Sequence, residues 1–159
     1  MGRITHAWVS VDSHGNSLWA EAKAALFAVS SALAIGLDSI IFEGDALQVI
    51  NSLQNSASYP HWSISNIIND INVLILSFSC ISFAHVLRAA NALAHSLAAW
   101  APFRNGLGAI PISSLPAHIV QADLVDGGGD VDGGEKDNEW RVFGDRGSWR
   151  VAGWIQPRL

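Results

Sequence analysis

A long apolar segment followed by a glycine and a short strand-like run constrains the fold of this chain more than any other feature. Residues 20–34 place apolar side chains at intervals of three and four, which is the spacing of one helix face, and the opposite face is hardly more polar. Gly36 is suited to end that helix, and residues 39–42 then read as a buried strand. A buried helix that leads into a buried strand predicts an α/β domain.

Two carboxylates flank this segment. Glu21 lies at the predicted start of the helix, and Asp45 directly follows the strand. Buried elements rarely carry acids at their ends without a reason, and acids brought together in this way are candidates for a functional site. We therefore treat Glu21 and Asp45 as candidate site residues.

The rest of the first hundred residues continues the alternation of helix and strand. Residues 63–78 form an amphipathic helical pattern, residues 79–87 read as a strand and residues 89–101 as a second Ala/Leu-rich helix. Because helices separate the strands at 40–42 and 81–86, we predict that these strands are adjacent and parallel. Trp62, just before the amphipathic helix, is suited either to stack on a base or to anchor the core, and we predict the core anchor.

Composition predicts how the chain is divided. We expect a partial N-terminal strand or hairpin in residues 1–19, an α/β domain in 20–103, a C-terminal extension in 104–125 and a Gly/Asp-rich disordered tail in 126–159. The tail is assigned in this way because it has no apolar period.

Charge and cysteine usage limit the surroundings and partners of the protein. The net charge is −5, and no Lys or Arg occurs from Ala24 to Leu87, which makes a poor surface for phosphates. The single cysteine, Cys80, suits a reducing compartment. We expect an intracellular protein, because no signal peptide opens the sequence and polar residues interrupt every apolar run before it reaches the length of a membrane span.

Four blocks in the same order carry a family resemblance. They are Ala-Glu-Ala at 20–22, Ile-Phe-Glu-Gly-Asp at 41–45, the Trp/Ile/Asp pattern of 62–71 and the Phe-x-His-Val-x-Arg-x-x-Asn-x-x-Ala-His-x-Leu-Ala pattern of 83–98. Together they resemble the plant ribonuclease H-like domains of the type 1 family, which are related to the ribonuclease H of non-LTR retroelements. The resemblance covers roughly residues 18–103. It implies a three-layer α/β/α domain that binds nucleic acid and hydrolyses the RNA strand of an RNA–DNA hybrid as an endonuclease.

The resemblance also implies roles for individual residues. The family arranges four acids around two Mg²⁺ ions. Glu21 matches the acid of the first helix and Asp45 the acid after the fourth strand, so both are expected to be catalytic and to bind metal. His95 falls at the position of the last-helix acid, as a third catalytic residue, but a histidine does not supply the missing negative charge.

The N-terminus departs from the family pattern. The family begins with a central strand that carries the first metal-binding Asp, followed by a hairpin, whereas only twenty residues precede Glu21. Either residues 8–18 are a remnant of the hairpin and the first strand is absent, or residues 9–12 are the first strand and Asp12 is its acid. The turn-rich sequence after Asp12 favours the first alternative, a domain truncated at its first strand.

The incomplete acid set leaves three functions open. The chain is a hybrid endoribonuclease with a degenerate site, a non-catalytic module that binds nucleic acid or protein, or an inactive fragment derived from a retroelement. The shortage of acids and the long segment without cations favour the second and third.

Overall fold

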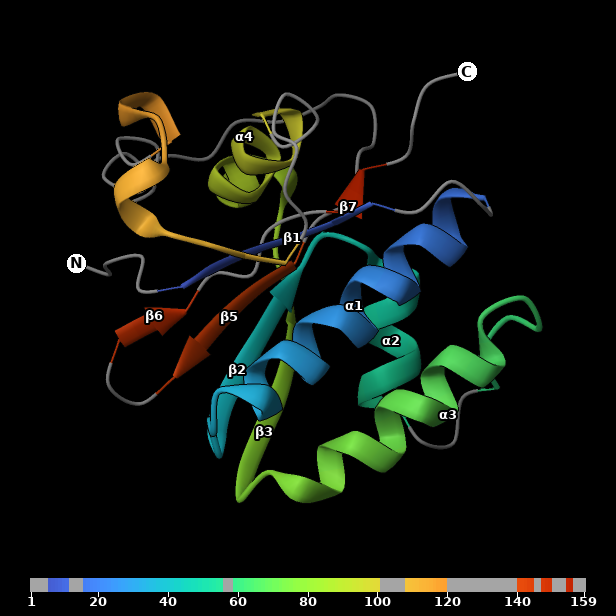
Figure 1. Ribbon diagram of the computed structural model, residues 1–159. Helices are drawn as coiled ribbons and strands as arrows, with labels where there is room; N and C mark the ends of the chain where they lie inside the picture. Colours follow the sequence, from blue (N-terminus) through green and yellow to red (C-terminus); the bar gives the residue numbers. More distant parts are fainter. Residues whose placement is uncertain are drawn as a thin grey trace.

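The computed structural model describes residues 6–11, 16–55, 59–100, 108–119, 140–144, 147–149 and 154–155. Helices and two small sheets form a mixed α/β architecture in this part, so the predicted fold class is confirmed (Figure 1). The elements are β1 Ala7–Val11, α1 Ser17–Ala34, β2 Ser39–Gly44, α2 Leu47–Gln54, α3 Ser65–Leu74, η1 Ile75–Ser77, β3 Cys80–His85, η2 Arg88–Asn91, α4 Ala92–Trp100, β4 Gly108–Ile110, η4 Ile112–Ser114, β5 Trp140–Gly144, β6 Gly147–Trp149 and β7 Trp154–Ile155. None of the described helices is long and apolar enough to cross a bilayer.

The first helix begins one turn before the apolar pattern predicts. Asn16 is its N-cap, and the side-chain oxygen of Asn16 accepts a hydrogen bond of 2.9 Å from the backbone N–H of Trp19. Residues 17–19 therefore belong to the first helical turn and not to the N-terminal strand or hairpin. As a consequence, Glu21 lies in the second turn of α1 and not at its start.

The predicted glycine stop of α1 is confirmed. Gly36 has a φ of 76°, and its N–H donates to the carbonyl of Leu33 at 2.9 Å. The N–H of Leu37 donates to the carbonyl of Ala32 at 3.1 Å, which completes a Schellman motif. Leu37 then packs against the core, so the chain turns directly into β2.

We expect Gly36→Ala to lower the free energy of unfolding by about 1–2 kcal/mol, because an L-residue is strained at positive φ. A Cβ at this position would meet nothing within 4 Å, so the loss comes from the backbone alone. Urea unfolding followed by circular dichroism measures the change. Gly36→Asn is the matched control and should lose less, since Asn tolerates this conformation. Equal stability of Gly36→Ala and the unmodified protein would contradict the assignment.

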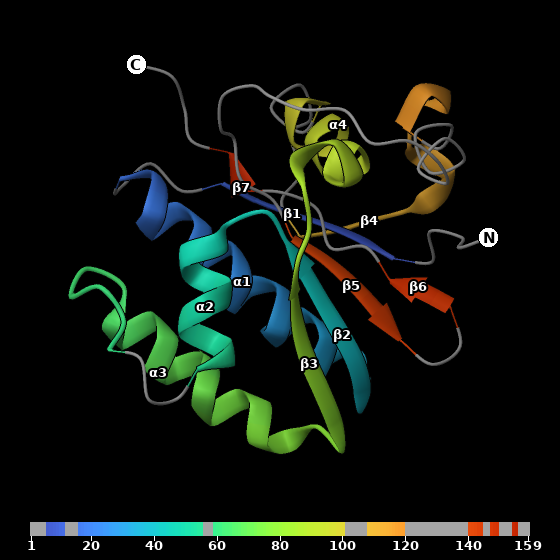
Figure 2. The same cartoon turned by 180° about the vertical axis from the view of Figure 1, so that it is seen from behind.

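The strands β2 and β3 pair as predicted. β2 and β3 are parallel, with a register that runs from Ser39 opposite Cys80 to Gly44 opposite His85. The connection between them passes through α2 and α3, which lie on the same side of the sheet as α1 (Figures 1 and 2). Parallel strands need such a crossover, so the order of the elements dictates the pairing.

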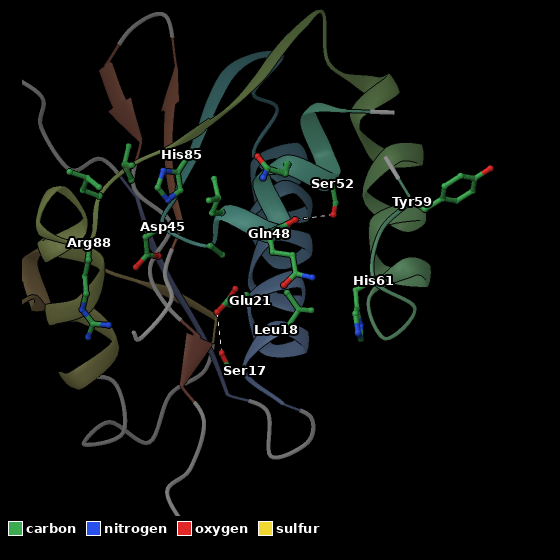
Figure 3. Close-up of a pocket in the computed structure, with 15 residues that line it drawn as sticks. Ser17, Leu18, Glu21, Asp45, Gln48, Ser52, Tyr59, His61, His85 and Arg88 are labelled. Atoms are coloured by element: carbon green, nitrogen blue, oxygen red, sulfur yellow. Dashed lines mark hydrogen bonds between the residues drawn. The ribbon is translucent and has the colours of Figure 1, made fainter. Parts of the chain in front are cut away.

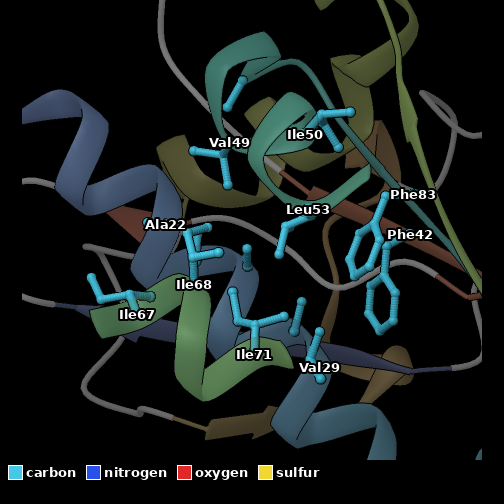
Figure 4. Close-up of a cluster of buried hydrophobic side chains, with 14 of the residues drawn as sticks. Ala22, Val29, Phe42, Val49, Ile50, Leu53, Ile67, Ile68, Ile71 and Phe83 are labelled. Carbon is cyan, nitrogen blue, oxygen red and sulfur yellow. The ribbon is translucent and has the colours of Figure 1, made fainter. Parts of the chain in front are cut away.

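The main core lies between these helices and one face of the sheet (Figure 4). Ile40 and Phe42 point into it, whereas Ile41 between them is 45% exposed on the other face. The Phe42 ring stacks on Phe83 of the neighbouring strand with 5.4 Å between ring centroids, and Phe78 meets the Phe42 ring edge-on at 6.1 Å. The alternation along β2 thus assigns one strand face to the core.

The amphipathic helix packs as its pattern indicates, but the residue before it does not. Ile67, Ile68 and Ile71 of α3 are buried. Trp62 is 82% exposed, so the prediction that it anchors the core is wrong. Ile64, at the start of the helix, is fully buried and belongs to the same apolar cluster as the three isoleucines. The turn that precedes α3 directs the indole into solvent instead.

Strands near both ends of the sequence add to the two sheets. β1 pairs antiparallel with β4 and parallel with β7, while β5 pairs antiparallel with the edge of β2 that β3 leaves open. β5, β6 and β7 lie where the sequence predicts a disordered tail. Pairing to an open strand edge uses backbone groups and needs no apolar period, so the pattern could not indicate it. All other residues of 126–159 lie outside the described residues, and the division into four segments stays a prediction.

Candidate functional site

A pocket of about 720 Å³ opens at the carboxyl ends of the two parallel strands (Figure 3). Because Gly44 pairs with His85, the residues that follow β2 and those that follow β3 reach the same edge of the sheet. The N-terminal turns of α1 and α2 and the segment before α3 complete the walls. The lining residues are Ser17, Leu18, Glu21, Asp45, Ala46, Leu47, Gln48, Asn51, Ser52, Tyr59, His61, His85, Val86, Leu87 and Arg88.

Glu21 enters the pocket from α1. It is only 8% exposed, among buried alanines of the same helix. The hydroxyl of Ser17, one turn earlier, donates a hydrogen bond of 3.2 Å to its Oε1. A carboxylate this deeply placed is desolvated on most sides, so a hydrogen-bond donor beside it reduces the cost of burial.

Asp45 enters from the end of β2 and is half-buried. The strand is fixed up to its last residue, because the N–H of Val86 donates to the carbonyl of Gly44 at 3.0 Å. Asp45 then precedes the first turn of α2, where the N–H of Leu47 donates to the Asp45 carbonyl at 3.1 Å. Backbone contacts on both sides of Asp45 therefore position its carboxylate at the rim of the pocket that contains Glu21.

The other predicted site residues cannot be placed in the same way. His95 belongs to α4, but its side chain lies outside the described part of the chain, as does Asp12. Convergence of His95 with the two acids, and the alternative that Asp12 supplies a further acid, stay predictions. Glu21 and Asp45 are the predicted residues that the structure brings into one pocket.

The described donors do not fit a centre of two magnesium ions. Mg²⁺ takes carboxylate oxygens and waters in octahedral geometry, and two ions held together share several acids. The pocket supplies two carboxylates, and within the described residues no group of three His, Cys, Asp or Glu side chains is arranged to hold a metal ion. Among the described residues, Glu21 and Asp45 are therefore the carboxylates that this pocket offers to a cation.

Two residues that sequence reasoning did not assign to the site lie next to Asp45. His85 is the last residue of β3, and Arg88 begins the short helix that follows. The argument that singled out Asp45 could have found both, since the ends of adjacent parallel strands meet at one edge. Arg88 is the one Lys or Arg among the described residues that line the pocket.

The opposite wall combines amides with aromatic rings. Gln48 and Asn51 of α2 offer neutral donors and acceptors, and Tyr59 and His61 come from the segment before α3. Residues 59–62 had no periodic signal in the sequence that could place them at the site. Only the packing of α3 beside α1 and α2 brings them to the pocket (Figures 2 and 3).

Comparison with known protein families gave a match. The family model described as reverse transcriptase-like matches residues 1–101. No curated protein and no solved structure matches the chain.

Proposed function

Since the chain belongs to the reverse transcriptase-like family, whose members have ribonuclease H-like domains, we propose that it binds nucleic acid at the pocket between α1, β2 and β3 and hydrolyses RNA–DNA hybrids only weakly. Within the family, the four sequence blocks favour the plant type 1 branch related to non-LTR retroelements. The observation that carries the proposal is that Glu21 and Asp45, from two separate elements, line one pocket.

The charges of the pocket favour recognition over hydrolysis. The family generally binds nucleic acid and usually uses Mg²⁺. Two carboxylates without further acids among the described lining residues would hold such ions poorly, so hydrolysis should be weak. Arg88 offers one charged contact to a phosphate, and the amides of α2 offer neutral contacts to sugar or base.

A binding measurement tests this proposal. We expect Arg88→Gln to weaken the binding of an RNA–DNA hybrid roughly three- to tenfold at low salt and to reduce the slope of log K against log salt by about 1, since one phosphate contact is lost. Fluorescence anisotropy with a labelled hybrid gives both values.

Lys23→Gln is the matched control, because it removes the same charge from α1 at a residue outside the pocket. Equal losses of hybrid affinity in Arg88→Gln and Lys23→Gln would show that the net charge of the protein, and not a contact in the pocket, determines binding. Unmodified protein that binds neither hybrid nor single strands would overturn the proposed function.

A further inference from the structure

Three aromatic residues at the α3 end of the pocket are held exposed. Tyr59 is 99% and Trp62 82% exposed, and His61 between them is exposed as well. Tyr59 and His61 line the pocket, and the His61 and Trp62 rings lie 5.5 Å apart at an angle of 35°. Solvent-exposed aromatic rings in this number beside a polar pocket are typical of a binding surface and not of a core.

Hydrogen bonds hold the backbone of the turn that carries His61 and Trp62, and they orient the His61 ring. The N–H of Ile64 donates to the carbonyl of His61 at 3.0 Å, and the hydroxyl of Ser65 donates to the carbonyl of Trp62 at 3.0 Å. The imidazole Nδ1 of His61 lies 2.8 Å from the Ser63 hydroxyl and accepts the Ser63 N–H at 3.3 Å. A ligand that stacks here would therefore need little ordering of the turn.

The charges near the rings determine what kind of ligand fits. No Lys or Arg occurs from Ala24 to Leu87, so this wall cannot bind a phosphate backbone by charge. Stacking of a base on an aromatic ring needs no cation, and the amides of Gln48 and Asn51 can pair with a base edge. The one arginine of the described lining, Arg88, follows β3 beside Asp45, on the other side of the pocket from His61 (Figure 3).

We propose that the α3 end of the pocket binds an unpaired nucleobase of a single strand, stacked on the neighbouring rings of His61 and Trp62, with the strand continuing toward Arg88. This inference rests on the proposed function and makes it more specific, because it assigns preference to an unpaired nucleotide over a continuous duplex. A base inside a duplex is stacked and paired already, so its face is not available to these rings.

Anisotropy titrations with three labelled probes test the proposal: a single-stranded 12-nucleotide RNA, its hybrid with complementary DNA, and an abasic strand of the same length. We expect Trp62→Ala to weaken binding of the single-stranded RNA about tenfold, as loss of one stacked base does, and to leave binding of the abasic strand unchanged. Leu76→Ala removes another side chain that is 83% exposed, but it belongs to η1 at the far end of α3 and not to the turn with His61, so it should have no effect. Because both side chains are exposed, neither variant disturbs the core, which circular dichroism verifies.

The possible outcomes separate this inference from the function on which it rests. Hybrid binding that depends on Arg88 but not on Trp62, together with equal affinity for intact and abasic strands, would overturn the inference and leave the proposed function in place. Absence of binding to every probe would overturn both. Self-association in light scattering that is lost in Trp62→Ala, without any change in nucleic-acid affinity, would show that the exposed rings form a protein interface and would overturn the inference.

Discussion

In the presence of Mg²⁺, the unmodified protein should cleave the RNA of an RNA–DNA hybrid on the order of 10²–10³-fold more slowly than a family member with all four acids, because charged groups aimed at the reacting phosphate are worth factors of this size. The pocket contributes Glu21 and Asp45, and the residue at the last-helix position, His95, adds no negative charge. A single-turnover assay with a labelled hybrid measures the rate. His95→Asp alone should raise that rate less than tenfold, since the acid set is still incomplete.

Two variants make the cleavage measurement decisive. Glu21→Ala removes an acid of the pocket, whereas Asp70→Ala removes an exposed acid of α3 that lies outside it. Residual cleavage by this protein should be slower in Glu21→Ala and unchanged in Asp70→Ala. Cleavage that neither substitution changes would come from a contaminant. Robust cleavage by the unmodified protein that Glu21→Ala abolishes would contradict the prediction and would mean that acids outside the described residues complete the site.

The largest effect on stability is expected at Phe42. Its ring is fully buried and contacts Phe83 and Phe78, so Phe42→Ala removes a large apolar side chain and leaves a cavity between β2, β3 and the helices. Such substitutions lower the free energy of unfolding by about 3–5 kcal/mol, a large share of the total for a domain of this size. Urea unfolding followed by circular dichroism gives the difference.

The neighbouring strand residue provides the control for this measurement. Ile41 lies on the other face of β2 and is 45% exposed, so Ile41→Ala should cost roughly 1 kcal/mol or less. A loss as large as that of Phe42→Ala would show that the Ile41 face is covered in solution. A small loss for Phe42→Ala would contradict the placement of the core on the helical side of the sheet.

The cleavage and stability experiments depend on structural predictions that patterns within single segments of the sequence already supported. Residues 20–34 could be assigned to a buried helix from apolar spacing, and Gly36 to its end, because an L-residue is strained in the left-handed conformation. The parallel pairing of the strands at 40–42 and 81–86 followed from the helices between them. Asp45 could be assigned to a site because the end of a strand in an open α/β sheet is where ligands bind.

Local sequence pattern could not show which apolar residue before α3 is buried, nor which segment pairs with the open edge of β2. Ile64 is fully buried whereas Trp62, two residues earlier in the turn before α3, is 82% exposed. β5 pairs with the free edge of β2 through backbone groups, which every sequence carries alike. The sequence by itself therefore determined the α/β class, the parallel strand pair and the two acids that end up together, and the same reasoning about strand ends extends to His85 and Arg88. Only the tertiary structure decided that the amides of α2 and the exposed rings before α3 would surround those acids, because that depends on how separate elements pack and not on the spacing of residues within any one of them.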